Sequence, residues 1–326
     1  MSSIISKKGF WAQLERPIMA LAPVADITDA VYRRLVARCG KPDVIFTEFV
    51  SVDGLCSPGR KNLLQHLRFD ESEHPIVAQF FGTDPEKFRE CARLAVELGF
   101  DGVDINMGCP VKVICKQGAG AALINEPELT QEIVQATIEG AGDLPVSVKT
   151  RIGFSTIDAE QWASTLLEAN PAAIIFHLRT RKQMYRPSAH WEVMPGLVEL
   201  ARGTGVLIIG NGDIQTLQQA EKVAAETGVD GVMMGRAALG NPWLFRRTRQ
   251  PETITLTERL DTLLEHAALF EAVFGFERSF VVMRKHLMAY ASGFSGAKEL
   301  RVMLQDVRCR RDVELAVAAF RSEKPQ

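Results

Sequence analysis

The chain has 326 residues and a formal net charge of −2, with 46% hydrophobic and 24% charged residues. This length exceeds a typical single domain but suits one large barrel with a smaller unit attached. No apolar run approaches the roughly 18 residues that span a bilayer, and the charge excludes a generic nucleic-acid-binding protein, whose binding domain is usually basic.

Short apolar runs, rich in β-branched residues, recur from residue 18 to about residue 245. Each is apolar on both faces, which is typical of parallel strands covered by helices on both sides. The predicted strands are 18–22, 43–49, 75–81, 102–107, 144–150, 172–178, 206–210 and 231–235.

Helix-like segments separate most of these runs. Thr28 and Asp29 precede a helix that ends at Gly40, and Pro85 begins the next one, as helix N-termini prefer polar residues and proline. Residues 50–74 show no clear pattern. Further helix starts are expected at 126–128 and 156–158.

The alternation of strands and helices predicts a (β/α)₈ TIM barrel. A doubly wound open sheet is the alternative, and it needs a Gly-rich dinucleotide fingerprint after its first strand. Here the first strand leads into Ala22-Pro23-Val24-Ala25-Asp26 instead, so the barrel is favoured.

The pattern changes after Pro251, where no strand-like run follows and residues 256–322 indicate several helices. We therefore predict a barrel domain of residues 1–250 and an all-helical domain of residues 251–326. Between Arg278 and Arg311, eight basic residues oppose two acidic ones. They can hold several phosphates if they share a face. An ordinary helix surface exposed to solvent explains the same residues equally well.

Polar residues follow the predicted strands where these end. In a barrel the functional residues lie at these C-terminal ends, and polar groups there are costly unless they have partners or a function. So many on one rim predict a functional site rather than separate structural roles. The residues are Pro23, Gln79, Asn106, Cys109, Lys149, Arg151, His177, Asn211, Gly212, Asp213, Gly235 and Arg236.

Three features of this rim carry chemical information. Residues 210–213 and 235–236 end the seventh and eighth strands, where glycine backbone and an arginine can bind a phosphate. Lys149 and Arg151 share a strand face, so they need an electron-rich partner such as a reduced flavin, or a structural carboxylate. Cys109 follows the fourth strand and can act as nucleophile, acid or redox thiol, although an isolated cysteine is more often inert.

The other five cysteines are scattered and predict neither a disulfide framework nor a structural metal site. The N-terminal residues 1–17 lack the apolar stretch of a signal peptide. We therefore expect a cytoplasmic protein.

Several motifs in order resemble the tRNA-dihydrouridine synthases of the bacterial broad type, from Leu21 to about Phe320. The most specific is Asn-x-Gly-Cys-Pro at 106–110, followed by the Gly-rich stretch 117–123. Supporting motifs lie at 22–29, 148–153, 177–181, 211–213, 235–236, 284–286 and 296–301.

The resemblance implies FMN at the barrel mouth, NADPH as reductant and tRNA as substrate. It implies that reduced FMN delivers a hydride to carbon 6 of uracil while Cys109 protonates carbon 5. Asn106, Lys149, Arg151 and His177 would surround the uracil, and Arg284, Lys285, Lys298 and Arg301 would contact the tRNA. The resemblance implies no metal ion and no membrane association, and it requires no more than a monomer. FMN would be held by Pro23, Val24, Ala25, Gln79, Lys149, His177, Asn211, Gly212, Asp213, Gly235 and Arg236.

The chain departs from the family pattern at a few positions. Val24 replaces a common methionine, Leu178 a common glycine, and Pro187 and His190 a glycine and an aspartate. We therefore expect the loop 178–191 to bind RNA in its own way.

Two other functions compete with this interpretation. An FMN-dependent barrel reductase of a free pyrimidine or enone does not need the basic C-terminal helices. A non-catalytic RNA-binding protein does not need Asn106, Cys109, Lys149 and His177 together.

Overall fold

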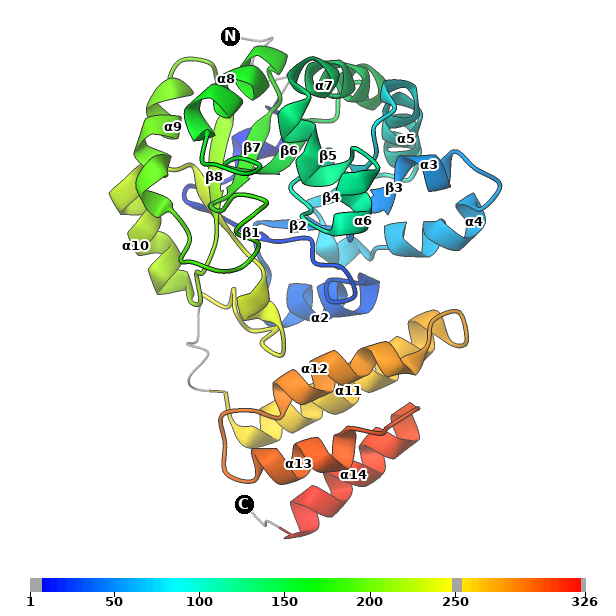
Figure 1. Cartoon of the computed structure of the whole chain (residues 1–326). Coiled ribbons are helices and arrows are strands. Elements are labelled where there is room, and N and C mark those ends of the chain that lie inside the picture. The colour runs from blue at the N-terminus through cyan, green and yellow to red at the C-terminus, as the bar shows by residue number, and fades with distance from the viewer. Residues whose placement is uncertain (1–7, 248–253, 324–326) are drawn as a thin grey trace.

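The computed structural model, which describes residues 8–247 and 254–323, has a closed ring of parallel strands at its centre (Figure 1). The ring closes because β1 pairs with both β2 and β9, and β2 pairs with β4. The short strand β3 (Val50–Ser51) adds to β4 at one end. The predicted (β/α)₈ TIM barrel is confirmed. Its strands are β1 (Ile18–Leu21), β2 (Val44–Phe46), β4 (Ile76–Phe81), β5 (Gly102–Met107), β6 (Val146–Arg151), β7 (Ala173–His177), β8 (Leu207–Asn211) and β9 (Gly231–Met234).

Helices surround the ring, and their starts follow from local sequence. The Asp29 carboxylate accepts a hydrogen bond from the backbone N–H of Tyr32. Asp84 accepts from two backbone N–H groups, with Pro85 as the first helical residue, so both predicted starts are confirmed. The outer helices are α2 (Ala30–Gly40), α5 (Pro85–Glu97), α7 (Pro127–Ala141), α8 (Ala159–Ala169), α9 (Met194–Leu200) and α10 (Leu217–Thr227).

The segment without a clear sequence pattern, 50–74, contains short elements. They are α3 (Val52–Leu55), α4 (Arg60–Leu63), η2 (Leu64–Leu67) and η3 (Glu71–Glu73). Elements of this length cannot show a helical period. Glu73 anchors the segment to α2, because its carboxylate lies 2.7 Å from Nε of the fully buried Arg33.

The barrel interior is apolar at one end and polar at the other. Trp11, from η1 (Gly9–Gln13), packs with Ile18, Val44 and Leu207, which begin their strands, and so closes the N-terminal end. Buried polar residues occupy the interior on β4, β5 and β6, between the second and the fifth residue of each strand; they are Gln79, Asp104, Asn106 and Ser147. Polar side chains thus begin below the C-terminal ends of these three strands.

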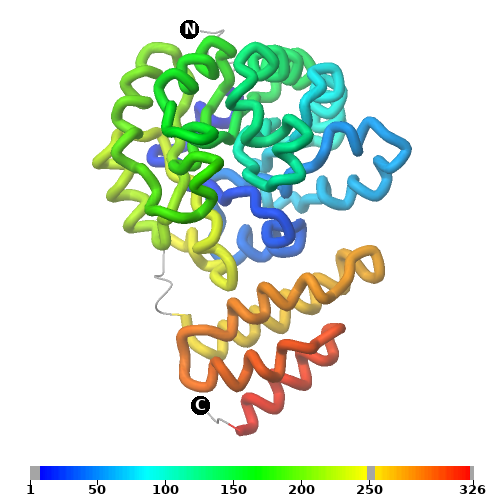
Figure 2. The backbone as a smooth tube through the Cα atoms, in the orientation of Figure 1, coloured from blue at the N-terminus to red at the C-terminus, as the bar shows by residue number. Residues whose placement is uncertain are grey.

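The C-terminal residues form only helices within the described range 254–323, as predicted. Figure 2 shows them gathered beside α2. There the Tyr32 ring lies 4.5 Å from that of His286. The predicted domain boundary at 250/251 lies outside the described residues. The helices are α11 (Leu256–Phe274), η8 (Phe280–Met283), α12 (Arg284–Tyr290), α13 (Ala297–Leu304) and α14 (Arg310–Glu323).

Across the described part of the chain, no helix combines the length and apolar character that crossing a membrane requires.

Candidate active site

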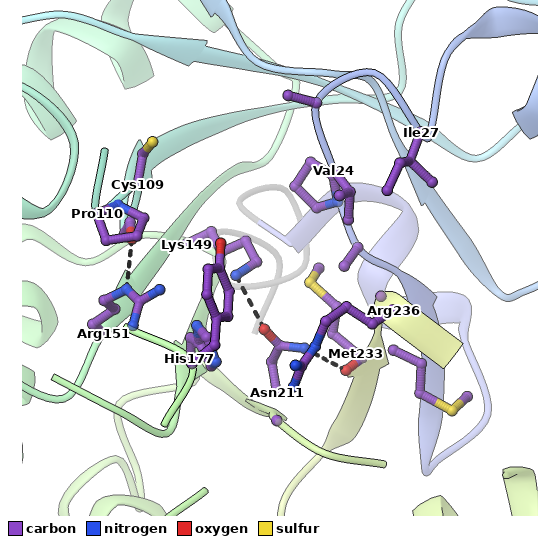
Figure 3. Close-up of a pocket in the computed structure, with 18 of the residues that line it drawn as sticks. Val24, Ile27, Cys109, Pro110, Lys149, Arg151, His177, Asn211, Met233 and Arg236 are labelled. Carbon is purple, nitrogen blue, oxygen red and sulfur yellow. Dashed lines mark hydrogen bonds between the residues drawn. The ribbon is translucent and has the colours of Figure 1, made fainter. Parts of the chain in front are cut away.

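A cavity of about 400 Å³ opens at the C-terminal ends of the strands. In Figure 3, Cys109 and Val24 lie on opposite sides of it. The cavity brings together nearly all the rim residues that the sequence singled out. Those that line it are Pro23, Val24, Ala25, Asn106, Cys109, Lys149, Arg151, His177, Asn211, Gly212, Asp213, Gly235 and Arg236.

Gln79 is the exception, since it lies beneath the cavity and outside its lining. Its amide Nε2 donates to Asp104 at 2.6 Å, and its Oε1 accepts from Asn106 Nδ2 at 3.0 Å. Ser147 donates to the other oxygen of Asp104 at 2.6 Å. Burial raises the pKa of Asp104 to about 7, although both hydrogen bonds act in the opposite direction.

The loop after β5 holds Cys109 by its backbone. Asn106 Oδ1 accepts hydrogen bonds from the N–H groups of Gly108 at 3.1 Å and Cys109 at 2.9 Å. Gly120, the first residue of η4 (Gly120–Asn125), has a φ of +62°, and a Cβ there would lie 2.8 Å from the Cys109 carbonyl oxygen. The Gly-rich stretch therefore serves this close approach.

Cys109 has the properties of a protonated thiol at the cavity wall. Its exposed fraction is 8%. Burial raises its pKa above the ordinary value, although Arg151 and Lys149 act to lower it. Cys115, from α6 (Lys112–Lys116), lies behind it, with its thiol 3.5 Å from the Cys109 carbonyl oxygen. A thiol that keeps its proton at neutral pH is suited to act as an acid.

Lys149 and Arg151 both line the cavity, as their spacing predicts. Lys149 Nζ donates to Asn211 Oδ1 at 3.2 Å, and burial, with Arg151 nearby, lowers its pKa to about 8. The Arg151 guanidinium donates to the carbonyl oxygens of Gly108, Thr180 and Met184. Carbonyl partners and the nearby Asp104 carboxyl therefore offset the repulsion between the two cations.

His177 completes this group as a neutral hydrogen-bond donor or acceptor. Burial, reinforced by Lys149 and Arg151, lowers its pKa far below the ordinary value. The imidazole is therefore uncharged at physiological pH.

Asp213 connects the two glycine-containing segments that follow β8 and β9. Its carboxylate accepts from Arg179 at 2.5 Å and from Arg236 at 2.8 Å. Arg236 begins η6 (Arg236–Ala238) and keeps 55% of its side chain exposed. Gly212 has a φ of +149°, and a Cβ there would lie 2.6 Å from that of Ala189. Glycine at 212 therefore permits close packing against Ala189, and the exposed Arg236 guanidinium is open to an anion.

Two aromatic residues of the lining were missed by the sequence analysis. Phe49 follows β2, and Tyr185 belongs to the loop 178–191. The Tyr185 ring lies 5.8 Å from the Arg151 guanidinium and 5.5 Å from that of Arg236. Loop residues follow no period, and no sequence signal marks these two.

The predicted tRNA-contacting residues do not line the cavity. Lys285, Lys298 and Arg301 are exposed on the C-terminal helices, and Arg284 is partly buried. Lys285 Nζ lies 3.2 Å from Asp26, which places that part of the helices close to the barrel mouth. Within the described ranges, no group of His, Cys, Asp or Glu side chains is arranged to hold a metal ion.

Comparison with known proteins decides the family. The family model described as dihydrouridine synthase matches residues 20–323. The chain belongs to the dihydrouridine synthase family. The resemblance seen in the motifs is confirmed, and the protein is an enzyme.

Named relatives of this dihydrouridine synthase cover nearly its whole length. A "Probable tRNA-dihydrouridine synthase" of Staphylococcus aureus (strain Mu50 / ATCC 700699) is 39% identical over 322 residues, 97% of each chain. "Probable tRNA-dihydrouridine synthase 2" of Bacillus subtilis (strain 168) is 39% identical over 318 residues, 96% of this chain and 97% of the relative.

Solved structures with low sequence identity show the same fold. A 2-naphthoyl-CoA reductase complex has a TM-score of 0.54 at 14% identity, covering 70% of this chain and 49% of that one. Morphinone reductase has a TM-score of 0.50 at 14% identity, covering 72% and 84% respectively. At this identity the likeness concerns the fold alone.

In this dihydrouridine synthase the unusual residues of the loop 178–191 hold the loop in place. Leu178 is fully buried. The Pro187 carbonyl oxygen accepts from Arg179 Nε at 2.8 Å, and His190 Nδ1 lies 2.7 Å from Glu192, in η5 (Trp191–Val193). Leu178 and His190 therefore contribute their side chains to the packing of the loop, whereas Pro187 contributes a backbone carbonyl that any residue would supply.

Proposed function

We propose that the enzyme reduces a uridine of tRNA to 5,6-dihydrouridine, with FMN in the cavity and NADPH as reductant. Family membership and the names of the relatives support the substrate. The observation that carries the proposal is the protonated thiol of Cys109, held in one cavity with Lys149, Arg151 and a neutral His177. We expect it to act in the cytoplasm as a monomer.

The residues present fit FMN. The cavity volume of about 400 Å³ lies in the range of roughly 300–1,000 Å³ that small-molecule sites occupy. Lys149 and Asn211 offer donors to an electron-rich ring, and Arg236 with the backbone at Gly212 and Gly235 offers an anion site for a phosphate. Pro23, Val24, Ala25, His177 and Asp213 line the same cavity and complete the proposed FMN contacts. Gln79, which was also predicted to hold FMN, lies beneath the cavity and would act through its hydrogen bond to Asn106.

The chemistry that reduced FMN would supply in this cavity is a hydride for carbon 6 of the uracil. Cys109 donates its thiol proton to carbon 5, so the double bond gains two hydrogens and the sulfur is left as a thiolate. Lys149 and Arg151 stabilise the negative charge that develops on the uracil oxygen and on this sulfur. Asn106 fixes the backbone of Cys109 and so positions the acid.

The target base must leave its stack in the folded tRNA, at a cost of a few kcal/mol. We propose that the C-terminal helices, with Arg284, Lys285, Lys298 and Arg301, offset this cost by contacting phosphates. They constitute the tRNA-binding domain of residues 251–326.

The experiment is to purify the protein, identify any released flavin by mass, and add NADPH with tRNA from a strain lacking its own synthases. Bound FMN and a gain of two hydrogens at a specific uridine are expected. Absence of flavin would overturn the proposal. Flavin with reduction of free pyrimidines or enones, but not of tRNA, would instead identify a small-molecule reductase.

A further inference from the structure

Arg278 lies between α11 and η8 and is surrounded by three carboxylates of the barrel. Nη1 lies 3.3 Å from Glu48 and 3.4 Å from Asp29, and Nη2 lies 3.4 Å from Asp26. Only 10% of the side chain is exposed, and its guanidinium also lies 5.4 Å from the Phe274 ring. Its place in the basic stretch from Arg278 to Arg311 suggests a phosphate contact, yet the structure directs its charge inward.

The carboxylates belong to the two segments that build one side of the cavity. Asp26 lies between Ala25 and Ile27, which both line the cavity, and Glu48 directly precedes the lining residue Phe49. The two segments are joined, since the Asp26 N–H donates to Glu48 at 2.5 Å. Asp26 has a φ of +57°, a conformation that needs support from its surroundings.

These carboxylates need a cation between them. Asp29 and Glu48 are nearly fully buried. Burial raises the pKa of Asp29 to about 6; it acts likewise on Glu48, whose pKa His66 and Arg278 nevertheless hold at about 2. Removing one partner from buried charges leaves the others uncompensated. His66 Nδ1 lies 3.4 Å from Glu48 but contacts neither aspartate. Lys285 contacts Asp26, and Arg33 contacts Glu73. Among the ion pairs of the described residues, Arg278 alone joins all three carboxylates.

We infer that Arg278 is a positioning residue, which fixes the cavity wall formed by residues 22–27 and Phe49. Through it, the C-terminal helices control how tightly the cavity binds its cofactor. The inference rests on the proposed function, because it takes FMN as the ligand of that cavity.

The test measures the FMN dissociation constant without tRNA, by titrating FMN fluorescence with apoprotein. Arg278→Met is expected to raise this constant by roughly tenfold or more, because the buried carboxylates lose their positively charged partner. Arg278→Lys, which keeps the charge but cannot reach three carboxylates, is expected to restore part of the affinity. The matched control is Arg321→Met, since Arg321 pairs with Asp261 at 2.6 Å, between α14 and α11. This variant is expected to bind FMN normally.

Failure of the wild type to bind FMN would overturn the proposed function and the inference together. If the wild type binds FMN and Arg278→Met binds it equally well, while its tRNA binding weakens, Arg278 is a phosphate contact and the inference alone is wrong. If Arg278→Met shows no cooperative melting transition, the FMN affinity of Asp26→Asn tests the inference instead. Asparagine tolerates the same backbone conformation, and the Asp26 side chain is 55% exposed. Severalfold weaker FMN binding supports the inference, and unchanged binding overturns it.

Discussion

The carboxamide oxygen of Asn106 accepts a hydrogen bond from the backbone N–H of Cys109 at 2.9 Å. Asn106 is held in turn by Gln79, and Gln79 by Asp104, so a buried chain of hydrogen bonds runs from the barrel interior to the backbone of Cys109. Because Asp104 accepts from the Gln79 NH₂ group, the Gln79 oxygen faces Asn106. The Asn106 oxygen is then free for Cys109.

We therefore predict that Asn106→Ala loosens the Cys109 loop. Turnover on tRNA should fall, and Cys109 should react faster with iodoacetamide, because a backbone anchor is lost. Mass spectrometry of the alkylated peptide measures the second effect. An unchanged alkylation rate would show that the loop is held by other contacts.

Cys109→Ala should retain FMN but lose turnover by about 10²–10⁴-fold, the usual contribution of a positioned general acid. Single-turnover reoxidation of the reduced enzyme by tRNA measures the loss. Cys115→Ala is the matched control, since Cys115 contacts the same loop but does not line the cavity. Equal rates in the two variants would refute the acid assignment.

Burial lowers the pKa of Lys149 to about 8. The FMN affinity of the free enzyme should therefore fall as the pH rises through this value. The sign follows because the protonated amine, present below that pH, attracts an electron-rich ring. Lys149→Arg should flatten this profile, since arginine stays charged, and Lys149→Met should bind weakly throughout. A wild-type profile without the fall would exclude Lys149 as the cation that FMN needs.

Arg236→Met should weaken FMN binding by roughly tenfold while leaving riboflavin binding unchanged, because a charge-assisted contact to phosphate is lost. Titrations with FMN and with riboflavin give the loss of affinity for each flavin, and the ratio of the two losses tests the phosphate contact. The control is Arg202→Met, whose exposed side chain pairs with Glu199. Equal losses for both flavins would place Arg236 at the ring rather than at the phosphate.

Replacing both Lys298 and Arg301 with alanine should weaken tRNA binding and reduce its salt dependence by about two counterions. FMN affinity should stay constant, since neither residue lines the cavity. Binding measured over a series of salt concentrations tests this. A slope identical to that of the wild type would remove these residues from the interface.

The sequence predicted the strands well because each is buried on both faces and shows a continuous apolar run. The run 43–49 was predicted too long, since β2 ends at Phe46 and Glu48 then turns toward Arg278. That contact spans 230 positions of the chain, so no local pattern reveals it. The rim residues of the cavity were predictable because barrels place function at strand ends, whereas Tyr185 reaches the cavity through an irregular loop.

The three hydrogen bonds of Arg151 go to backbone carbonyl oxygens, two of them in the loop 178–191. Arg179 likewise donates to the carbonyls of Arg186 and Pro187. Every residue type carries a carbonyl, so these contacts do not depend on which side chains stand at positions 180, 184, 186 and 187. Side chains at these four positions can therefore be exchanged, which changes the surface at this edge of the cavity without moving Cys109, the proposed acid.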